Sequence, residues 1–255
     1  MANSHSNLTS LFTDIASAIR EKNGNTNTIV ADAFPTAIRD IEVGESADKI
    51  FEKVLSRGFS EINNYEEVAT IGNYAFYSCM RLTTVSSPFC TSIGSAAFMY
   101  CTALTTANFP KCTTIGNGAF SRCYTLTTVS FPVCTTIGNY AFYNCTSLAT
   151  ASFPVCTTIS SNAFANCNAL ATANFPECTS IGSYAFEFCF NLKSLYLTGS
   201  SICTLSASNA FTSTPIGGYS TSAGTYGSIY VPASLLTSYK TATNWTYFSS
   251  RFVGI

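Results

Sequence analysis

Apolar and polar positions repeat along this chain with a period of 22 residues between Ile71 and Leu192. Each copy has an isoleucine four residues before an Ala-Phe pair, a cysteine three residues after that pair, and a leucine three residues further on. The pairs begin at Ala75, Ala97, Ala119, Ala141, Ala163 and Ala185. Six copies in strict register predict a repeat architecture, in which stacked coils bury one continuous core.

One unit reads LTTANFPKCTTIGNGAFSRC, from Leu104 to Cys123. Alternation from Leu104 to Phe109 predicts a short strand with one buried face, and Pro110 ends it because proline cannot donate to a ladder. We expect Gly116 to permit the turn to the far side of the coil. The Ala-Phe pair and the second cysteine then pack inward on a short helical or irregular segment.

The regions on either side of the repeats differ in composition. Most of the charged residues lie in the first 61 positions, where apolar spacing predicts helices over residues 8–19, from Pro35, and after Ser46. The last segment predicts a strand through Tyr230, a helix that opens at Pro232 and a final strand-like FVGI, with Trp245 closing the last coil. We therefore divide the chain into a helical N-terminal region (1–58), a repeat array (59–212) and a C-terminal capping segment (213–255).

The motif IGxxAFxxCxxL, together with the frame LxxLxLxx(N/C) that precedes it, resembles the BspA-like or Treponema-type leucine-rich repeat over about residues 66–212. The resemblance implies an α/β repeat solenoid: a leucine-rich-repeat array of about seven 22-residue coils, with a small helical N-terminal region and a C-terminal strand-helix cap. Proteins of this kind are commonly bacterial surface adhesins.

A second resemblance lies in the string LTSLFTDIASAIREKNGNTNTIVADAFPTAIRDIE, which is similar to the N-terminal segment of phage and prophage tail-associated proteins. It implies a tail-associated role, with a homo-oligomer (a trimer, if the protein is a tail fibre) formed through residues 1–58. The alternative is a plain helical cap over the open end of the solenoid, and both can hold at once.

Composition excludes some partners. Charged residues form 10% of the chain and the net charge is −1, so we expect no nucleic-acid partner, which would need clustered Lys and Arg. No apolar run is long enough to span a membrane, and the start lacks the features of a secretory signal. We expect a protein made in the cytoplasm that reaches a virion tail or a cell surface after assembly.

Twelve cysteines raise the question of metal sites and disulfides. Zinc sites need close cysteine pairs with histidine, and none occurs, so we expect no metal or other cofactor. Equivalent cysteines in adjacent coils would lie close enough for a disulfide, but free thiols fit a reducing cytosol better. We interpret the cysteines as small buried hydrophobes and expect no disulfide.

Catalysis finds little support in this chain. The only histidine is His5, so a nucleophile paired with histidine would have to use it. No phosphate-binding loop, dinucleotide fingerprint or zinc-protease motif appears. We expect no catalytic residues and no enzymatic activity.

Two surfaces are candidates for binding. The exposed positions of the predicted strands form a flat sheet of hydroxyl and amide groups, although threonine is also simply a good strand former. Residues of this strand face are Thr106, Asn108, Thr128, Ser130, Thr150, Thr172, Asn174 and Tyr196. The other surface lies beside the Ala-Phe pairs, where the copies vary and are rich in aromatic residues.

Tyrosine mixed with asparagine and serine is typical of recognition surfaces, and exposed aromatics in number suggest a partner surface. The alternative is that several of these rings fill grooves between coils. The candidates are Tyr74, Tyr77, Tyr100, Tyr124, Tyr140, Tyr143, Tyr184 and Phe188.

The sequence therefore favours a non-enzymatic binding or adhesion module, phage tail-associated or on a cell surface, that binds a bacterial surface protein or glycan. The alternative is a structural spacer or assembly component of a tail-like particle without a ligand of its own. An ice- or crystal-binding surface is disfavoured, because the strand rows pair threonine with serine or asparagine.

Overall fold

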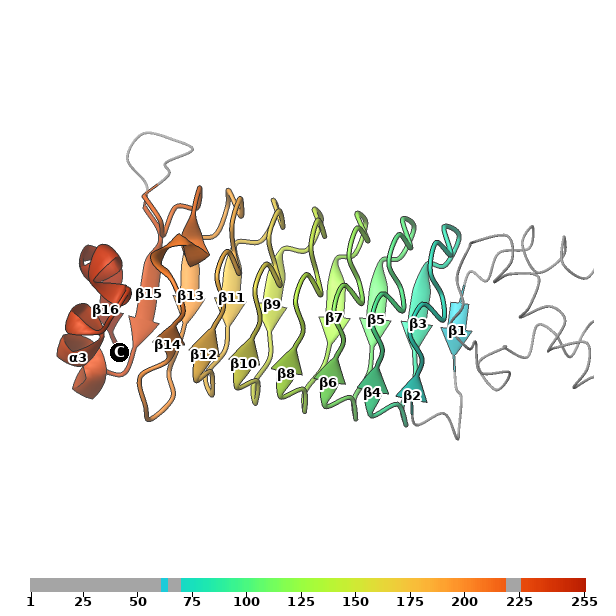
Figure 1. Cartoon of the computed structure of the whole chain (residues 1–255), viewed down its shortest axis with the longest axis horizontal. Helices are drawn as coiled ribbons and strands as arrows, with labels where there is room; N and C mark the ends of the chain where they lie inside the picture. The colour runs from blue at the N-terminus through green and yellow to red at the C-terminus, as the bar shows by residue number, and fades with distance from the viewer. Residues whose placement is uncertain (1–60, 64–69, 219–225) are drawn as a thin grey trace, which may run out of the picture.

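The structure is a computed structural model of the chain, and it describes residues 61–63, 70–218 and 226–255. Within these ranges the chain winds into stacked coils, and each strand lies beside the equivalent strand of the next repeat (Figure 1). The expected repeat solenoid is confirmed. The expected helices and the proposed assembly region of residues 1–58 lie outside the described residues.

Each coil contributes one strand to each of two sides, and every strand pair is parallel. The first side consists of β1 Glu61–Asn63, β3 Thr84–Ser86, β5 Thr106–Asn108, β7 Thr128–Ser130, β9 Thr150–Ser152, β11 Thr172–Asn174 and β13 Ser194–Tyr196. The second side consists of β2 Thr70–Ile71, β4 Ser92–Ile93, β6 Thr114–Ile115, β8 Thr136–Ile137, β10 Thr158–Ile159, β12 Ser180–Ile181 and β14 Thr204–Leu205. The central residue of nearly every first-side strand and the last residue of every second-side strand point into the core.

The third side of the first six coils is a ribbon of turns, whereas the Ala-Phe pair of the seventh coil lies on the short helix η3 Ser208–Phe211. Of the two expected forms, the irregular one therefore predominates. Tyr140 N–H donates to Ser161 O in the next coil at 3.1 Å, and Phe142 N–H donates to Ala163 O at 2.7 Å. Ala141, between them, donates back to Gly138 O at 3.3 Å, and Tyr143, directly after them, donates back to Tyr140 O at 3.1 Å. This alternation satisfies the backbone without a regular strand or helix.

The glycine after each isoleucine has a different role from the expected one. Gly94, Gly116, Gly138 and Gly182 do not have positive φ angles. A Cβ atom on Gly116 would lie 2.6 Å from the carbonyl carbon of Gly94 in the preceding coil. The expectation that glycine permits the turn here was wrong: it permits the close approach of two backbones.

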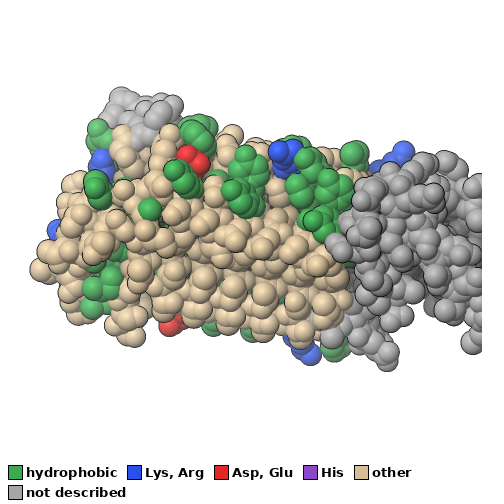
Figure 2. Space-filling view, in the orientation of Figure 1, with side chains coloured by type: hydrophobic (Ala, Val, Ile, Leu, Met, Phe, Trp, Pro, Cys, Tyr) green, Lys and Arg blue, Asp and Glu red, His purple; other side chains and the backbone are tan. Residues whose placement is uncertain are grey.

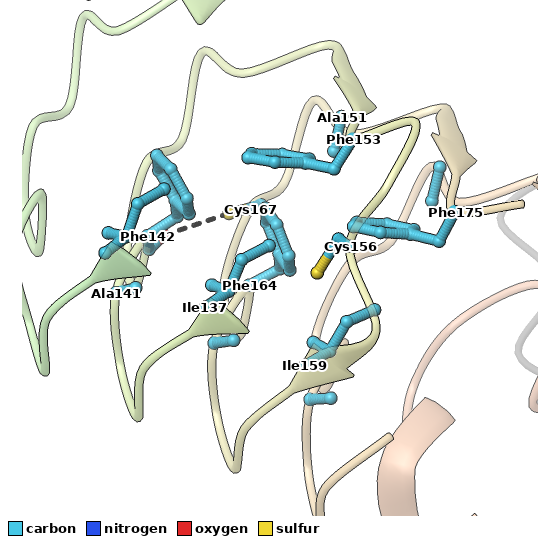
Figure 3. Close-up of a cluster of buried hydrophobic side chains, with 14 of the residues drawn as sticks. Ile137, Ala141, Phe142, Ala151, Phe153, Cys156, Ile159, Phe164, Cys167 and Phe175 are labelled. Atoms are coloured by element: carbon cyan, nitrogen blue, oxygen red, sulfur yellow. Dashed lines mark hydrogen bonds between the residues drawn. The ribbon is translucent and has the colours of Figure 1, made fainter. Parts of the chain in front are cut away.

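The core contains two parallel stacks of phenylalanine rings (Figure 3). In one stack, the Phe142 and Phe164 centroids lie 5.1 Å apart with planes 8° apart. In the other, the Phe153 and Phe175 centroids lie 5.5 Å apart with planes 2° apart. Burying each ring stabilises the fold by about 1.5–3 kcal/mol, so the repeat period is also the period of the main stabilising contacts.

The cysteines pack as the sequence predicts. Eleven of the twelve are buried, Cys79 is partly buried, and all are free thiols. Cys167 Sγ donates to Phe142 O at 3.1 Å (Figure 3), and Cys156 Sγ donates to Thr158 O at 3.4 Å. Burial raises the pKa of the Cys123 thiol to about 12, which keeps it neutral inside the core.

The C-terminal segment closes the open end of the stack. After the seventh coil, which ends in η3 Ser208–Phe211, it consists of β15 Ser228–Val231, η4 Ala233–Leu235, α3 Leu236–Thr241, η5 Trp245–Arg251 and β16 Phe252–Gly254. Trp245 is fully buried 5.9 Å from the Phe211 ring, and its Nε1–H donates to Cys203 O at 2.7 Å. Tyr239 Oη accepts the Cys203 N–H at 2.9 Å. The expected closing role of Trp245 is thus confirmed.

The first side is interrupted once, between β7 and β9. Strand β7 pairs with β5, and β9 pairs with β11, but the two do not pair with each other. Figure 1 shows this wider gap, whereas the second side runs from β2 to β14 without a break. Phe109 N–H donates to Ser130 O at 2.9 Å, but the equivalent bond from Phe131 to Ser152 is missing. The strand pairing is therefore interrupted on the first side only. We call this interruption the opening between β7 and β9.

Candidate binding surface

Three rows of side chains run along the turn side of the solenoid, one residue per coil in each row. They are the residue before each Ala-Phe pair, the residue directly after it, and the next residue along. We call the aromatic members of these rows the aromatic ridge: Tyr74, Tyr77, Tyr100, Tyr140, Tyr143, Tyr184 and Phe188. Figure 2 shows hydrophobic side chains gathered along one edge of the solenoid.

The ridge residues are accessible to a partner. Tyr140 is 48% exposed, and Tyr74, Tyr77, Tyr184 and Phe188 are also exposed. Tyr100 and Tyr143 are half-buried. The alternative, that the rings fill grooves between coils, therefore applies only to Tyr100 and Tyr143, and only to the buried part of each ring.

The rings form separate clusters along the ridge. Tyr77 lies 5.9 Å from Tyr74 and 5.7 Å from Tyr100, measured between ring centroids. Tyr140 and Tyr143 form an edge-on pair at 5.7 Å. Between the clusters the rows carry small or amide side chains, among them Gly118, Ser121, Asn162, Ala165 and Asn166.

Two of the three rows hold the backbone in the left-handed region. Tyr140 has φ 58°, Tyr184 has φ 57° and Tyr100 has φ 64°. A side chain with a Cβ in this region costs about 1 kcal/mol, and glycine and asparagine tolerate it best. Gly118 and Asn162 occupy the position of Tyr140 and Tyr184 in other coils, and Asn144 and Asn166 occupy the position of Tyr100. A tyrosine at these positions is thus unfavourable for the local backbone. Residues held in such unfavourable backbone conformations cluster at functional sites.

Tyr124 belongs to none of the three rows. It is exposed, but it makes no ring–ring contact within the described part of the chain. The structure thus brings seven of the eight aromatic candidates onto one edge and leaves Tyr124 beside it.

The strand face lies on the first side, and its side chains are solvent-accessible as expected. Asn108 Nδ2 donates to Ser86 Oγ at 3.3 Å, and Asn174 Nδ2 donates to Ser152 Oγ at 3.4 Å. The most exposed strand positions of this side flank the opening between β7 and β9: Thr128, Ser130, Thr150 and, next to them, Ser152. At the opening between β7 and β9, the equivalent positions are Ser130 and Ser152. No asparagine side chain therefore links these two coils.

Sequence analysis missed the continuation of this face at its C-terminal end. Tyr196 stacks on Tyr230 with centroids 4.6 Å apart and planes 12° apart. The signal was present, because YVP after Ile229 matches the strand frame of the repeats.

The second side carries a threonine row that sequence analysis also overlooked. Thr113 Oγ1 donates to Thr91 O at 3.1 Å, Thr135 Oγ1 to Thr113 O at 3.2 Å, and Thr157 Oγ1 to Thr135 O at 3.2 Å. Each hydroxyl proton is therefore used to join one coil to the preceding one. This row holds the stack together, and its hydroxyls are not available to donate to a lattice or a ligand.

The chemistry of the described residues is limited. In the ranges that the structure describes, no group of histidine, cysteine or acidic residues could hold a metal ion. No helix there is long and apolar enough to cross a membrane. Burial raises the pKa of Cys145 and Cys189 well above the ordinary range, which suppresses the thiolate that a nucleophile needs.

Comparison with known proteins identifies the repeat. The family model described as "BspA type Leucine rich repeat region" matches six copies, over residues 27–148 and 113–223. No curated protein matches the chain.

Two solved structures show the extent of the structural likeness. A leucine-rich-repeat protein of T. pallidum is 27% identical, with 53% of this chain and 55% of that chain covered and a TM-score of 0.37. A leucine-rich cell surface protein of Faecalibacterium prausnitzii is 26% identical, with 51% and 52% covered and a TM-score of 0.39. The matched part spans about half the length of each of these proteins.

Proposed function

This chain belongs to the BspA-type leucine-rich-repeat family, and on that premise we propose that it is a non-enzymatic binding or adhesion module. Its aromatic ridge recognises a protein or glycan on a bacterial surface. One observation carries the proposal: Tyr140 and Tyr184 are exposed at left-handed backbone positions where other coils have alanine, glycine or asparagine. The fold alone gives no reason for a ring there.

The ridge suits recognition better than the strand face does. Tyrosine gives a large, rigid contact area at low entropic cost, and the ridge holds such rings in pairs, as at Tyr140 and Tyr143. The amides of the strand face are instead engaged with neighbouring serines.

The location is a finer proposal. A phage-tail location rests only on the N-terminal string of residues 8–42, whereas a cell-surface location rests on the resemblance of the repeats to bacterial surface adhesins. We place the module on a phage tail or a cell surface, assembled through residues 1–58. Light scattering on the full chain and on a chain starting at Ser60 tests the assembly. A trimer that becomes a monomer supports a tail fibre, whereas a monomer in both cases contradicts assembly through these residues.

Binding itself is tested with fluorescently labelled full chain on a panel of intact bacterial cells. The double variant Tyr140→Asn, Tyr143→Ser should lose about tenfold or more in affinity for the cells that bind wild type. The matched control is Tyr247→Ser, because Tyr247 is 75% exposed on η5 and belongs to none of the three rows. Unchanged affinity of the ridge variant contradicts the proposal, and binding to no cell favours the spacer alternative.

A further inference from the structure

The three rows of the turn side contain one basic side chain among the described residues, Arg122. Its guanidinium lies over the Tyr100 ring, with Cζ 4.9 Å from the centroid. Its Nη1 also donates a hydrogen bond to the Tyr100 hydroxyl. Tyr100 therefore holds the guanidinium both by its face and by its edge, which fixes a long side chain that would otherwise be mobile.

No carboxylate balances this charge in the described part of the chain, since the hydrogen bond and the cation–π contact of the guanidinium are both with Tyr100. The one acidic residue of the rows is Glu187, three coils away. At about 4.8 Å per coil the separation is roughly 14 Å, too far for an ion pair. A guanidinium has five N–H donors, and the contact with Tyr100 uses one of them.

The backbone at Arg122 shows the same feature as the tyrosines of the ridge. Its φ is 62°, while Asn144 and Asn166 occupy this position in the next two coils. Asparagine is the better residue for the backbone here. The charged side chain is thus present against local backbone preference, as expected of a recognition residue.

We propose that Arg122, positioned by Tyr100, binds an aspartate or glutamate carboxylate on a protein partner of the aromatic ridge. The inference rests on the proposed function and names the chemistry of its partner. A guanidinium presents parallel N–H donors that match the two oxygens of a carboxylate. Asn144, the next residue of the same row, supplies an amide about one coil away. The surrounding mix of tyrosine, asparagine and serine is the composition of a protein-binding surface.

The test is a titration of the full chain followed by NMR of the arginine Nε–H resonances. The probe is an acetylated, amidated hexaglutamate peptide, and the corresponding hexaglutamine peptide is its neutral control. Arg251 is the matched internal control, because its Cζ lies 3.9 Å from the Tyr226 ring centroid and it belongs to none of the three rows. We expect the Arg122 resonance to shift saturably with hexaglutamate only, and Arg251 to shift little.

Variants separate recognition from nonspecific attraction. Arg122→Gln should abolish the saturable shift changes of the neighbouring ridge amides, and Tyr100→Leu should weaken binding several-fold, whereas Tyr226→Leu should change nothing. Equal shifts at Arg122 and Arg251, or no saturable shift at Arg122, overturn the proposal. An equal response to inorganic phosphate overturns the carboxylate assignment.

Failure of this inference is distinguishable from failure of the proposed function. If Arg122→Gln binds bacterial cells like wild type while the Tyr140, Tyr143 double variant does not, the ridge stands as the binding surface. The assigned role of Arg122 is then wrong.

Discussion

The ring of Phe120 stacks on the ring of Phe142 in the next coil, with centroids 5.3 Å apart and planes 4° apart. Phe142 stacks in turn on Phe164, so it has a ring on both sides. Phe76, at the start of the described stack, contacts only Phe98 in this way. Central and terminal rings of one repeated slot therefore differ in how much packing each one contributes.

Replacing Phe142 with alanine should lower the free energy of unfolding by about 3–5 kcal/mol, because the cavity is enclosed on both sides. The matched variant is Phe76→Ala, at the end of the stack, which should cost less. Urea unfolding followed by circular dichroism measures both. Equal losses would show that the stack does not transmit packing between coils.

Replacing Tyr140 with asparagine should leave the free energy of unfolding unchanged or raise it by up to about 1 kcal/mol, since asparagine tolerates the left-handed region. Tyr143 does not have a positive φ. Tyr143→Asn therefore loses the ring contact at 5.7 Å without a compensating gain and should be destabilising. A loss for Tyr140→Asn as large as for Tyr143→Asn would mean that the ring stabilises the fold.

Stability should fall as the pH rises above about 9. Below the ordinary thiol pKa of 9.0 the cysteines are protonated in both states, and their burial contributes fully. Above it the unfolded chain loses protons, while the folded chain, in which the pKa of Cys123 is about 12, keeps them. The free energy of unfolding then falls by up to about 1.4 kcal/mol per pH unit for each such thiol.

Urea unfolding between pH 7.5 and 10.5 under reducing conditions measures this dependence. The control is Cys123→Ala, which should show a shallower decline by the contribution of one thiol. A free energy of unfolding that stays constant to pH 10.5 would contradict the buried, neutral state of the cysteines.

The opening between β7 and β9 should be visible in hydrogen exchange. The Phe131 amide lacks the bond to the next coil that Phe109 and Phe153 make at 2.9 Å and 3.0 Å. We expect it to exchange about tenfold or more faster than those two amides. Equal protection of all three would show that the first side is continuous in solution.

Much of the fold could be predicted because packing obeys the same period as the sequence. Ile137, Phe142 and Cys145 have the same residue type at the equivalent position of all six copies, so their place in the core could be identified by comparing copies. The left-handed backbone at Tyr140 could not, because glycine, alanine, asparagine and tyrosine all occur at that position. Similarly, the opening beside Ser130 arises between two units with nearly the same apolar pattern.

The candidate surface was predicted in part. Variation among copies identified the aromatic residues, because positions that vary are free of packing constraints. Variation marks Arg122 as well, but its role could not be read from the sequence. That role depends on the Tyr100 ring beneath it and on the absence of a carboxylate within reach in the described part of the chain.

The central claim is that the aromatic ridge is the surface that contacts the partner. Oxidative footprinting of the full chain, free and bound to the bacterial cells that retain it, tests this directly by mass spectrometry. The account predicts that oxidation of the exposed ridge residues, Tyr140 above all, decreases on binding, while Tyr196 on the strand face and Tyr247 on η5 remain as reactive as before. Protection of Tyr196 with unchanged oxidation of Tyr140 would contradict it and assign binding to the strand face.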